Sequence, residues 1–484
     1  MSPTLANLVY ACGIAGLFYL DRDKSVRTSK ALWLPVVYLW IIGSRPVSVW
    51  LGMAPPSGAD TQIEGSPIDA AVFAVLLIAA FAVLAARGSR IITFLSGKFP
   101  KLVLLYFLFC LVSVTWSDYP GPALKKWTKS TLDVAMILIV VTDVQPVAAL
   151  RRLFSRVGFI LLPLSLLLIK YYPGVGRFYG FWNGAEMNVG MTLDKNLLGL
   201  ITFVLSLGAV WRVLALLSGD ETTPDRRRHL LAQGTLLAIG MWLLILSNSA
   251  TSLVCFVLGA GLMLATKLRY MRRHPAAVHT FVLSLAVTAA LVMLLGGGAS
   301  ATQALGRSET LTGRTDIWAA VIPLASNPLV GAGFESFWIS PSVHRRLWQL
   351  IPGLPLNEAH DGYLEVYLNL GWVGVGLIVL ILIDGYKRAV KAFRCEPALG
   401  ALLLAYVLAA MTYNVAEAGF RLMESCWIFF LLAVIEAGNF TACIGAGVSR
   451  PVSERVPDLP ARNALASKSY NGKHGWKVAG RRAI

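Results

Sequence analysis

The chain has 484 residues, of which 56% are hydrophobic and only 14% are charged. Soluble domains average about 45–50% apolar and about 25% charged residues, so this composition excludes an ordinary soluble globular protein and excludes disorder over most of the chain. The net charge of +17 would indicate nucleic-acid binding in a soluble protein. In a membrane protein, basic residues collect in cytoplasmic loops, so this surplus must first be compared with the predicted topology.

Long apolar runs recur along the chain, and each is about long enough to cross a ~30 Å hydrocarbon layer as a helix. They predict an all-α integral membrane protein, a polytopic bundle of about 12–13 transmembrane helices with a large, partly helical loop outside. Polar residues interrupt the second run at Ser44-Arg45-Pro46 and the start of the fifth at Lys126-Trp127-Thr128-Lys129. The expected spans are 4–20, 31–51, 68–86, 101–117, 124–142, 153–170, 194–217, 229–247, 250–266, 279–296, 364–383, 399–415 and 425–443.

Basic residues are concentrated in every second connection between these spans. Because cytoplasmic loops carry an excess of Lys and Arg, this alternation places the N-terminus outside and the C-terminus inside. The basic surplus is therefore explained by topology and gives no evidence for nucleic acid. The basic segments are 21–30, 87–101, 143–156, 218–230, 267–273, 384–394 and the tail from 444, which together hold 30 of the 43 Lys and Arg residues.

The chain is expected to form one membrane domain, residues 1–445, followed by a basic tail, residues 446–484. The tail is rich in Pro, Ser, Lys and Arg and poor in apolar residues, which predicts a disordered cytoplasmic segment that contacts anionic lipid. Two connections on the outside are unusually long, 171–193 and 297–363. Long connections in compact proteins are usually functional or disordered, and the aromatic content of 297–363 argues against disorder.

Arg314 is the first candidate functional residue of the long outside loop. Apolar residues from Arg314 to about Ser326 recur at helical spacing and predict a short helix, kinked by Pro323 and ending at Asn327-Pro328. A guanidinium in the first turn joins the free N–H groups of a helix N-terminus, and the pair suits a phosphate or pyrophosphate. The alternative is an arginine bonded to loop carbonyls or to Asp316.

The same loop contains a basic cluster, His344-Arg345-Arg346, which either contacts phosphate or lies at the membrane interface. The loop ends with His360, just before an apolar span. A histidine at this position can act as a general base or hydrogen-bond a substrate. Its neighbours Glu358, Asp361 and Glu365 are the groups that would orient it or raise its pKa. The alternative is a helix-capping segment with an ordinary interfacial histidine.

The shorter outside segment places Arg177 among several aromatic residues. This pattern is typical of a sugar-phosphate site, in which rings stack on pyranose faces, and also of an aromatic interface belt with a snorkelling arginine. Asp194 and Lys195 stand where the next span begins. Ionisable groups at this depth are functional candidates.

In this order, the segments resemble the O-antigen ligase and polysaccharide polymerase family, over roughly residues 100–440. Two further stretches are similar to the exopolysaccharide-polymerase branch: Val114-Thr115-Trp116-Ser117-Asp118-Tyr119-Pro120-Gly121 and Asp194-Lys195-Asn196-Leu197-Leu198-Gly199. The core of the resemblance is carried by Gly313-Arg314-Thr315-Asp316-Ile317-Trp318, Asn327-Pro328-Leu329-Val330-Gly331-Ala332-Gly333, Ala359-His360-Asp361-Gly362-Tyr363-Leu364-Glu365 and Gly371-Trp372-Val373-Gly374.

The resemblance implies a metal-independent, inverting membrane glycosyltransferase without a cofactor, in the bacterial inner membrane. Its site would face the periplasm and take a glycan from an undecaprenyl-pyrophosphate carrier. A polymerase passes the glycan to a lipid-linked repeat unit and a ligase passes it to the lipid A core; a chain-length regulator and a flippase are further implied partners. Arg314 and His360 match the family's essential residues. The implied substrate-binding residues are Arg177, Lys195, Arg345, Arg346, Asp361 and Glu365, with Asp361 standing where many members have Asn.

The two extra stretches favour exopolysaccharide or O-antigen polymerisation, with ligation to lipid A core as the alternative. A rival from another class is a flippase or transporter for a lipid-linked oligosaccharide. It predicts short loops, an internal repeat and charges deep within the spans, whereas this sequence has a long outside loop with its charges near the interface. A scaffold role leaves the Arg314 and His360 pattern unexplained.

Overall fold

The computed structural model of the chain describes residues 2–440, apart from 24–25, 54–65, 180–183, 185, 222, 269–270, 272–274, 295–311 and 352–355. The chain divides into two compact units, Met1–Val448 and Ser449–Ile484. The described residues all belong to the first unit. The predicted tail, residues 446–484, lies outside the described residues, as does much of the loop that precedes Arg314.

The described part of the chain is almost entirely α-helical. A single antiparallel hairpin occurs among the described residues, with β1 (Arg177–Tyr179) paired to β2 (Glu186–Asn188). The helices are α1 (Pro3–Leu20), α2 (Trp33–Ile42), α3 (Val47–Trp50), α5 (Pro67–Ala86), α6 (Ser89–Gly97), α7 (Lys101–Ser113), α8 (Pro120–Val141), α9 (Pro146–Tyr171), α10 (Pro173–Gly176), α11 (Lys195–Ser218), α12 (Arg226–Ser247), α13 (Ala250–Ala265), α15 (Pro275–Leu294), α17 (Thr312–Val321), α18 (Pro341–Leu350), α19 (Gly362–Cys395), α20 (Pro397–Tyr413) and α21 (Ser425–Glu436).

The prediction of an all-α polytopic membrane protein is confirmed. Within the described residues, six helices are long and apolar enough to cross a membrane: α1, α5, α9, α11, α12 and α19. A seventh crossing would be the bent pair α6 and α7, whose axes differ by 94°, and four shorter apolar helices accompany them. Every expected span overlaps a helix, while the total of 12–13 crossings remains a prediction.

The second expected span, 31–51, is broken. Helix α2 ends at Ile42 and α3 begins at Val47, because Pro46 lacks an N–H and disfavours the helical conformation of Arg45 before it. The Arg45 guanidinium instead donates hydrogen bonds to the carbonyl oxygens of Thr192 (3.0 Å) and Val175. The interruption at Ser44-Arg45-Pro46 thus anchors the 171–193 connection.

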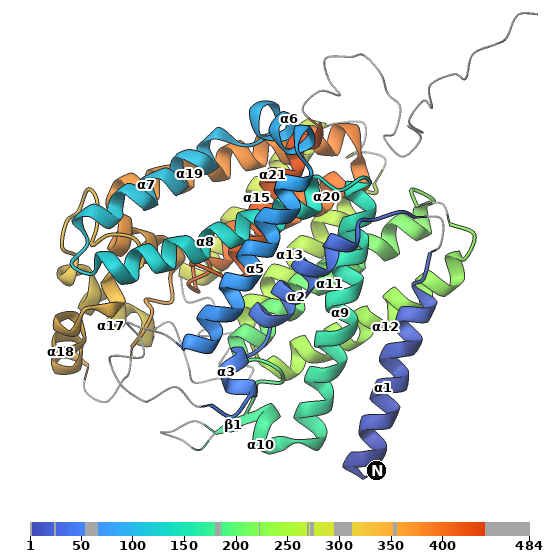
Figure 1. Ribbon diagram of the computed structural model, residues 1–484, viewed down its shortest axis with the longest axis horizontal. Helices are drawn as coiled ribbons and strands as arrows, with labels where there is room; N and C mark the ends of the chain where they lie inside the picture. Colours follow the sequence, from blue (N-terminus) through green and yellow to red (C-terminus); the bar gives the residue numbers. More distant parts are fainter. Residues whose placement is uncertain are drawn as a thin grey trace, which may run out of the picture. The chain divides into compact units, whose positions relative to one another are not determined.

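The interior of the helical unit is built from helices that are apolar on all sides. Nearly every residue of α20 and α21 is buried, as is 83% of the apolar stretch of α11. By contrast, α1 and α5 are only 11% and 17% buried over the same kind of stretch, and Figure 1 shows α1 at the margin of the described unit. Exposed apolar faces of this kind suit contact with lipid.

Helix α19 is interrupted at Gly371, where φ is 63° and ψ is −166°. The glycine-bearing turn Gly331–Gly333 fits into this break so closely that a Cβ atom on Gly371 would lie 2.2 Å from the Leu329 backbone. Backbone groups freed by the break must be satisfied inside a membrane protein, and here the turn satisfies them. The hydrogen bonds run from Trp372 N to Pro328 O (2.9 Å), Val373 N to Leu329 O (3.1 Å), Ala332 N to Leu368 O (3.1 Å) and Gly333 N to Asn369 O (2.8 Å).

The Trp116–Gly121 stretch packs against the same turn. The Ser117 hydroxyl lies 2.7 Å from that of Ser336, and the Ser113 hydroxyl accepts a hydrogen bond from Phe334 N at 2.9 Å. Figure 1 shows α17 and α18 together near the segment where α7 ends and α8 begins. Motifs more than 200 residues apart in the sequence therefore form one contiguous structure.

Candidate active site

His360 is held by a dense set of local hydrogen bonds. The neighbouring Ala359 N–H donates to Glu365 Oε1 (2.5 Å), and the Ala359 carbonyl accepts from Trp318 Nε1 (2.8 Å). Asp361 caps α19 by accepting from Leu364 N at 2.8 Å. His360 itself has a φ of 51°, the left-handed region that non-glycine residues rarely adopt. Such strain persists only where the surroundings enforce it, and it is concentrated at functional sites.

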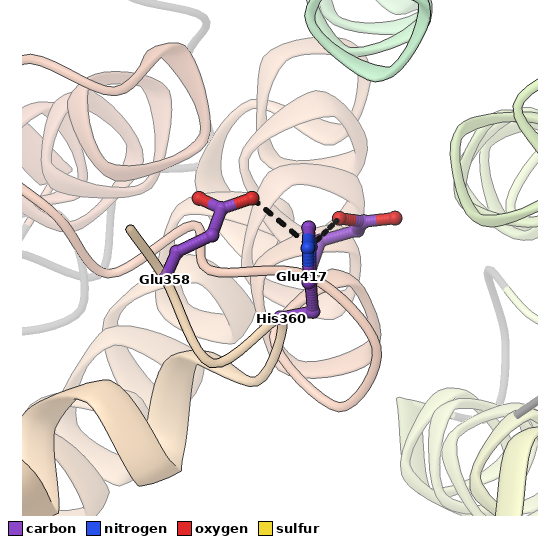
Figure 2. Close-up of side chains that lie close together, drawn as sticks. All are labelled: Glu358, His360 and Glu417. Carbon is purple, nitrogen blue, oxygen red and sulfur yellow. Dashed lines mark hydrogen bonds and ion pairs between the residues drawn. The ribbon is translucent and has the colours of Figure 1, made fainter. Parts of the chain in front are cut away.

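The imidazole of His360 faces two carboxylates, as Figure 2 shows. Its Nδ1 lies 2.9 Å from Glu358 Oε1 and 3.4 Å from Glu417 Oε2. Among the described residues, no hydrogen bond is made by Nε2. The ring is therefore oriented on its Nδ1 side, while Nε2 remains available to a substrate.

Two arginines extend His360 and its two carboxylate partners into a chain of five alternating charges. Arg314, in the first turn of α17, approaches Glu417 Oε1 with its Nη2 at 2.7 Å. Arg421 approaches Glu358 Oε2 with its Nη1 at 2.9 Å. Each carboxylate thus joins His360 to one arginine. We call this set, Arg314, Glu417, His360, Glu358 and Arg421, the charge cluster.

The charge cluster is shielded but reachable from solvent. The Glu417 side chain is only 6% exposed, whereas those of Arg314 and His360 are 26% and 29% exposed. With His360 protonated, the five side chains carry three positive and two negative charges. Glu358 is 27% exposed, so of the two carboxylates only Glu417 is buried. A partly buried site with a net positive charge attracts an anion, and Arg314 and His360 can both be reached from solvent.

The surroundings favour the protonated form of His360. Burial alone would lower its pKa, but hydrogen bonds and charges from Glu358 and Glu417 outweigh burial and raise the pKa to about 10. For Glu358, burial is likewise outweighed by His360 and Arg421, so its pKa is lowered. Neighbouring carboxylates, Glu365 first among them, outweigh burial and raise the pKa of Arg421. At neutral pH, His360 is a cation.

Asp194 and Lys195 lie at the start of α11. Asp194 caps this helix by accepting from Asn196 N (2.7 Å) and Leu197 N (3.0 Å). Burial, followed by the like charges of Glu358 and Glu417, raises the pKa of Asp194. The start of α11 is therefore close enough to the charge cluster for Glu358 and Glu417 to affect the pKa of Asp194. Lys195 follows Asp194 at the first helical position.

The other predicted site residues have different surroundings. Arg177 donates to the Ile169 carbonyl (2.9 Å) and pairs with Glu186 across its own hairpin (2.8 Å). Arg345 and Arg346 are exposed on α18. No contact among the described residues joins these three arginines to the charge cluster, so their substrate roles remain predictions.

Asp361 and Glu365 make hydrogen bonds that organise the loop rather than contacting the histidine ring. Asp361 is the α19 cap, and burial raises its pKa. Glu365 is 2% exposed and accepts from both Ala359 N and Trp338 Nε1 (2.8 Å). Of the three acidic neighbours expected to orient His360, only Glu358 contacts it directly.

Sequence reasoning missed Glu417 and Arg421. Both lie in the connection between α20 and α21, which the predicted topology places on the same side as His360. Glu417, Arg421 and Glu424 follow one another within eight residues of an otherwise apolar region. Charges at this depth are functional candidates, and that signal would have identified them.

The three side chains of Figure 2 also have a spacing that a metal ion could bridge, since their ligand-type atoms lie within 4.8 Å of one another. The chemistry of the donors favours an ion-pair network instead. Both carboxylates are shared with Arg314 and Arg421, and Nδ1 faces them both, so a metal ion would have to displace these pairs. Metal independence remains a prediction.

Comparisons with known proteins give two matches. A family model described as O-Antigen ligase matches residues 235–381, which include Arg314, His360 and the break in α19 but stop short of Glu417. The chain is also 26% identical over 302 residues to "Exopolysaccharide production protein ExoQ" of Rhizobium meliloti (strain 1021). That alignment covers 61% of this chain and 66% of the relative, slightly less than two thirds of its length. With the helical membrane architecture, these matches support the resemblance to an O-antigen ligase/polysaccharide polymerase-like family that the motifs carry.

Proposed function

We propose that this protein is a periplasm-facing membrane glycosyltransferase that moves a glycan from an undecaprenyl-pyrophosphate carrier to a sugar acceptor. Its proposed reaction is the polymerisation of exopolysaccharide repeat units. The observation that carries the proposal is the charge cluster, in which Glu417 joins Arg314 to His360 beside the outside loop. The positive-inside distribution of Lys and Arg supports the periplasmic orientation.

The chemistry of the cluster suits a diphosphate leaving group. In an inverting transfer, the acceptor hydroxyl oxygen bonds to the anomeric carbon as the bond from that carbon to the diphosphate oxygen breaks, and the hydroxyl proton passes to water or to the departing diphosphate. Negative charge accumulates on the diphosphate and must be stabilised. Fixed cations aimed at this charge supply that stabilisation without a metal ion. Arg314, with a rigid fork of donors, is the residue best suited to bind phosphate oxygens.

His360 is proposed to bind the substrate as an imidazolium. With Nδ1 held by Glu358 and Glu417, its Nε2–H can donate to a phosphate or sugar oxygen. A general base at the acceptor hydroxyl must be unprotonated, and the raised pKa of about 10 disfavours that state at neutral pH. The two roles predict opposite responses to pH, so a pH–rate profile separates them.

Glu417 is proposed as a positioning residue for both cations. Its side chain is buried, and its two oxygens face different partners. Before substrate binds, the Glu417 carboxylate holds the Arg314 guanidinium in place and limits its flexibility. A bound diphosphate then competes with Glu417 for this guanidinium. Preorganised groups avoid the free-energy cost of reorientation during the reaction.

Polymerisation is favoured over ligation by two observations. The Trp116–Gly121 stretch, which is similar to the exopolysaccharide-polymerase branch, contacts Gly333 and Ser336 through Ser117. The curated relative is named for exopolysaccharide production. Both activities share the donor chemistry and differ in the acceptor, so the acceptor decides between them.

The test is a transfer assay with purified protein and a lipid-diphosphate-linked repeat unit. Products with two or more repeats would support the polymerase, whereas glycan joined only to an added lipid A core would identify a ligase. Movement of the lipid across vesicles without any new glycosidic bond would identify a flippase and contradict the proposal.

A further inference from the structure

A second, strongly basic site lies at the other end of α19 from His360. A cavity of about 320 Å³ opens between the last turns of α19 and the beginning of α15. Four cations of α19 line it, together with Tyr386 and with His279 of α15; these cations are Lys387, Arg388, Lys391 and Arg394. Nothing in the proposed glycosyl transfer uses this cavity.

The cavity has more positive than negative charge. Asp384 is the single acidic residue among its described lining residues, and it pairs with Arg388 through Nε at 2.6 Å. Arg388 also donates to the Lys98 carbonyl at 3.2 Å, so its guanidinium is committed to the protein. The side chains of Lys387, Lys391 and Arg394 remain without a paired carboxylate in the described lining.

These three cations lie on one face of α19. Their spacing of four and three residues places them on successive turns, and all three are exposed. Three like charges along one helical face repel one another, so the arrangement is unfavourable unless an anion lies between them. A phosphate group matches the ammonium and guanidinium donors well.

His279 and Tyr386 complete the polar side of the cavity. The His279 Nδ1 and the Tyr386 hydroxyl lie 2.5 Å apart, and their rings meet edge to face with centroids at 5.6 Å. This contact links α15 to α19 across the cavity. The second imidazole nitrogen and the hydroxyl are further groups that can hydrogen-bond phosphate or glycerol oxygens.

The surface next to the cavity is apolar on both helices. Along α19, Ile383 and Leu380 lie one and two turns before Lys387 and are 45% and 48% exposed. Along α15, Leu283 and Val287 lie one and two turns after His279 and are 65% and 48% exposed. Both helices therefore carry exposed apolar residues within two turns of the cavity.

We propose that this cavity binds the phosphate headgroup of an anionic phospholipid, with the acyl chains along the apolar strip of α15 and α19. Lys387, Lys391 and Arg394 contact the phosphate, and Leu283 and Ile383 contact the chains. Basic cavities between transmembrane helices are a recurrent way of recognising anionic headgroups. A free phosphate ion would use the cations but gain nothing from the apolar strip.

The proposal is tested by native mass spectrometry of the delipidated full-length protein titrated with phosphatidylglycerol. Each Lys or Arg near a lipid surface contributes about fivefold in affinity, so replacing three should weaken binding by about 10²-fold. The variant is Lys387→Gln with Lys391→Gln and Arg394→Gln. A second variant, Leu283→Asn, leaves the charge unchanged and should shorten lipid retention on its own.

The matched control is Arg226→Gln with Arg227→Gln, which removes exposed cations from the start of α12 on the same side of the predicted topology. This control should retain wild-type affinity for phosphatidylglycerol. Phosphatidylcholine should bind the wild type weakly, and inorganic phosphate should not displace the lipid. Equal loss in the control, equal binding of both lipids, unchanged binding in the triple variant, or displacement by inorganic phosphate would each overturn the proposal. The last of these would assign the cavity to a free phosphate ion.

Discussion

The carboxylate of Glu417 approaches Arg314 Nη2 at 2.7 Å with one oxygen and His360 Nδ1 at 3.4 Å with the other. Arg314 and His360 are the two residues that the motifs identified, and they come from the start of α17 and from the segment just before α19. A buried side chain from a third part of the chain joins them. Glu417 therefore links the two residues of the candidate active site.

Glu417→Gln should reduce transfer activity by about 10²-fold, because misplacing two catalytic groups by about 1 Å has an effect of this size. Glutamine keeps the shape but removes the charge that attracts both cations. The matched control is Glu424→Gln. Burial raises the pKa of Glu424 to about 8, so this residue is mostly neutral at pH 7 and its replacement removes little charge. Activity and thermal stability of both variants in detergent provide the measurement; equal activities would show that Glu417 has no positioning role.

The raised pKa of His360 predicts a specific dependence of stability on pH. Because its folded-state pKa of about 10 lies above the unfolded value near 6.5, the ion pairs of His360 stabilise the fold fully below pH 6.5. This contribution should disappear as the pH rises through about 10. The free energy of unfolding of the wild type should therefore fall across this window more steeply than that of His360→Gln. Parallel curves for the two proteins would contradict the charge cluster.

Arg314→Lys should lower activity by about 10²–10³-fold, close to the effect of Arg314→Ala, because an ammonium cannot replace the two-pronged guanidinium at a diphosphate. The measurement is the initial rate with a lipid-diphosphate donor, with Arg226→Lys as the control. Retention of most activity by Arg314→Lys would show that only the charge matters.

Gly371→Ala should destabilise the protein by at least about 1–3 kcal/mol, the cost of a left-handed backbone in a non-glycine residue. Its new Cβ atom would also lie 2.2 Å from the Leu329 backbone. Gly376 is a close control on the same helix, since a Cβ there meets nothing within 4 Å. Thermal unfolding in detergent should separate the two variants clearly. Similar midpoints would mean that the interlock of α19 with the 331–333 turn does not stabilise the fold.

Chelation tests the choice between an ion-pair network and a metal site at Glu358, His360 and Glu417. Transfer activity should be unchanged after treatment with EDTA and dialysis. Loss of activity with EDTA, followed by recovery on addition of a divalent cation, would replace the ion-pair interpretation with a metal centre.

The sequence predicted the helices well because apolar runs of membrane length depend on local composition. It predicted the break near Arg45 as an interruption but not its consequence, the anchoring of the 171–193 connection through Thr192. Arg314 and His360 were identified from motifs. Glu417 and Arg421 were not, because their proximity to His360 depends on how α17, α19 and α20 pack over long sequence separations.

The close fit of the 331–333 turn into the break at Gly371 was likewise not predictable from the sequence. Each glycine belongs to a motif that the sequence displays, yet nothing local indicates that a turn would fill a break in a membrane helix. For Arg177, the sequence pattern suggested a ligand but did not indicate the residue that pairs with it. Its residue type and aromatic neighbours suggested a sugar-phosphate site, while the hairpin partner Glu186 became apparent only in the fold.

The central claim is that the charge cluster is where the glycosidic bond forms. The most direct measurement is the rate of glycan transfer from a lipid-diphosphate donor by purified wild-type, Arg314→Ala and His360→Ala proteins with equal thermal stability. The proposed mechanism predicts that both variants remain folded and lose at least about 10²-fold in rate. Full activity in both folded variants would contradict the assignment of the site.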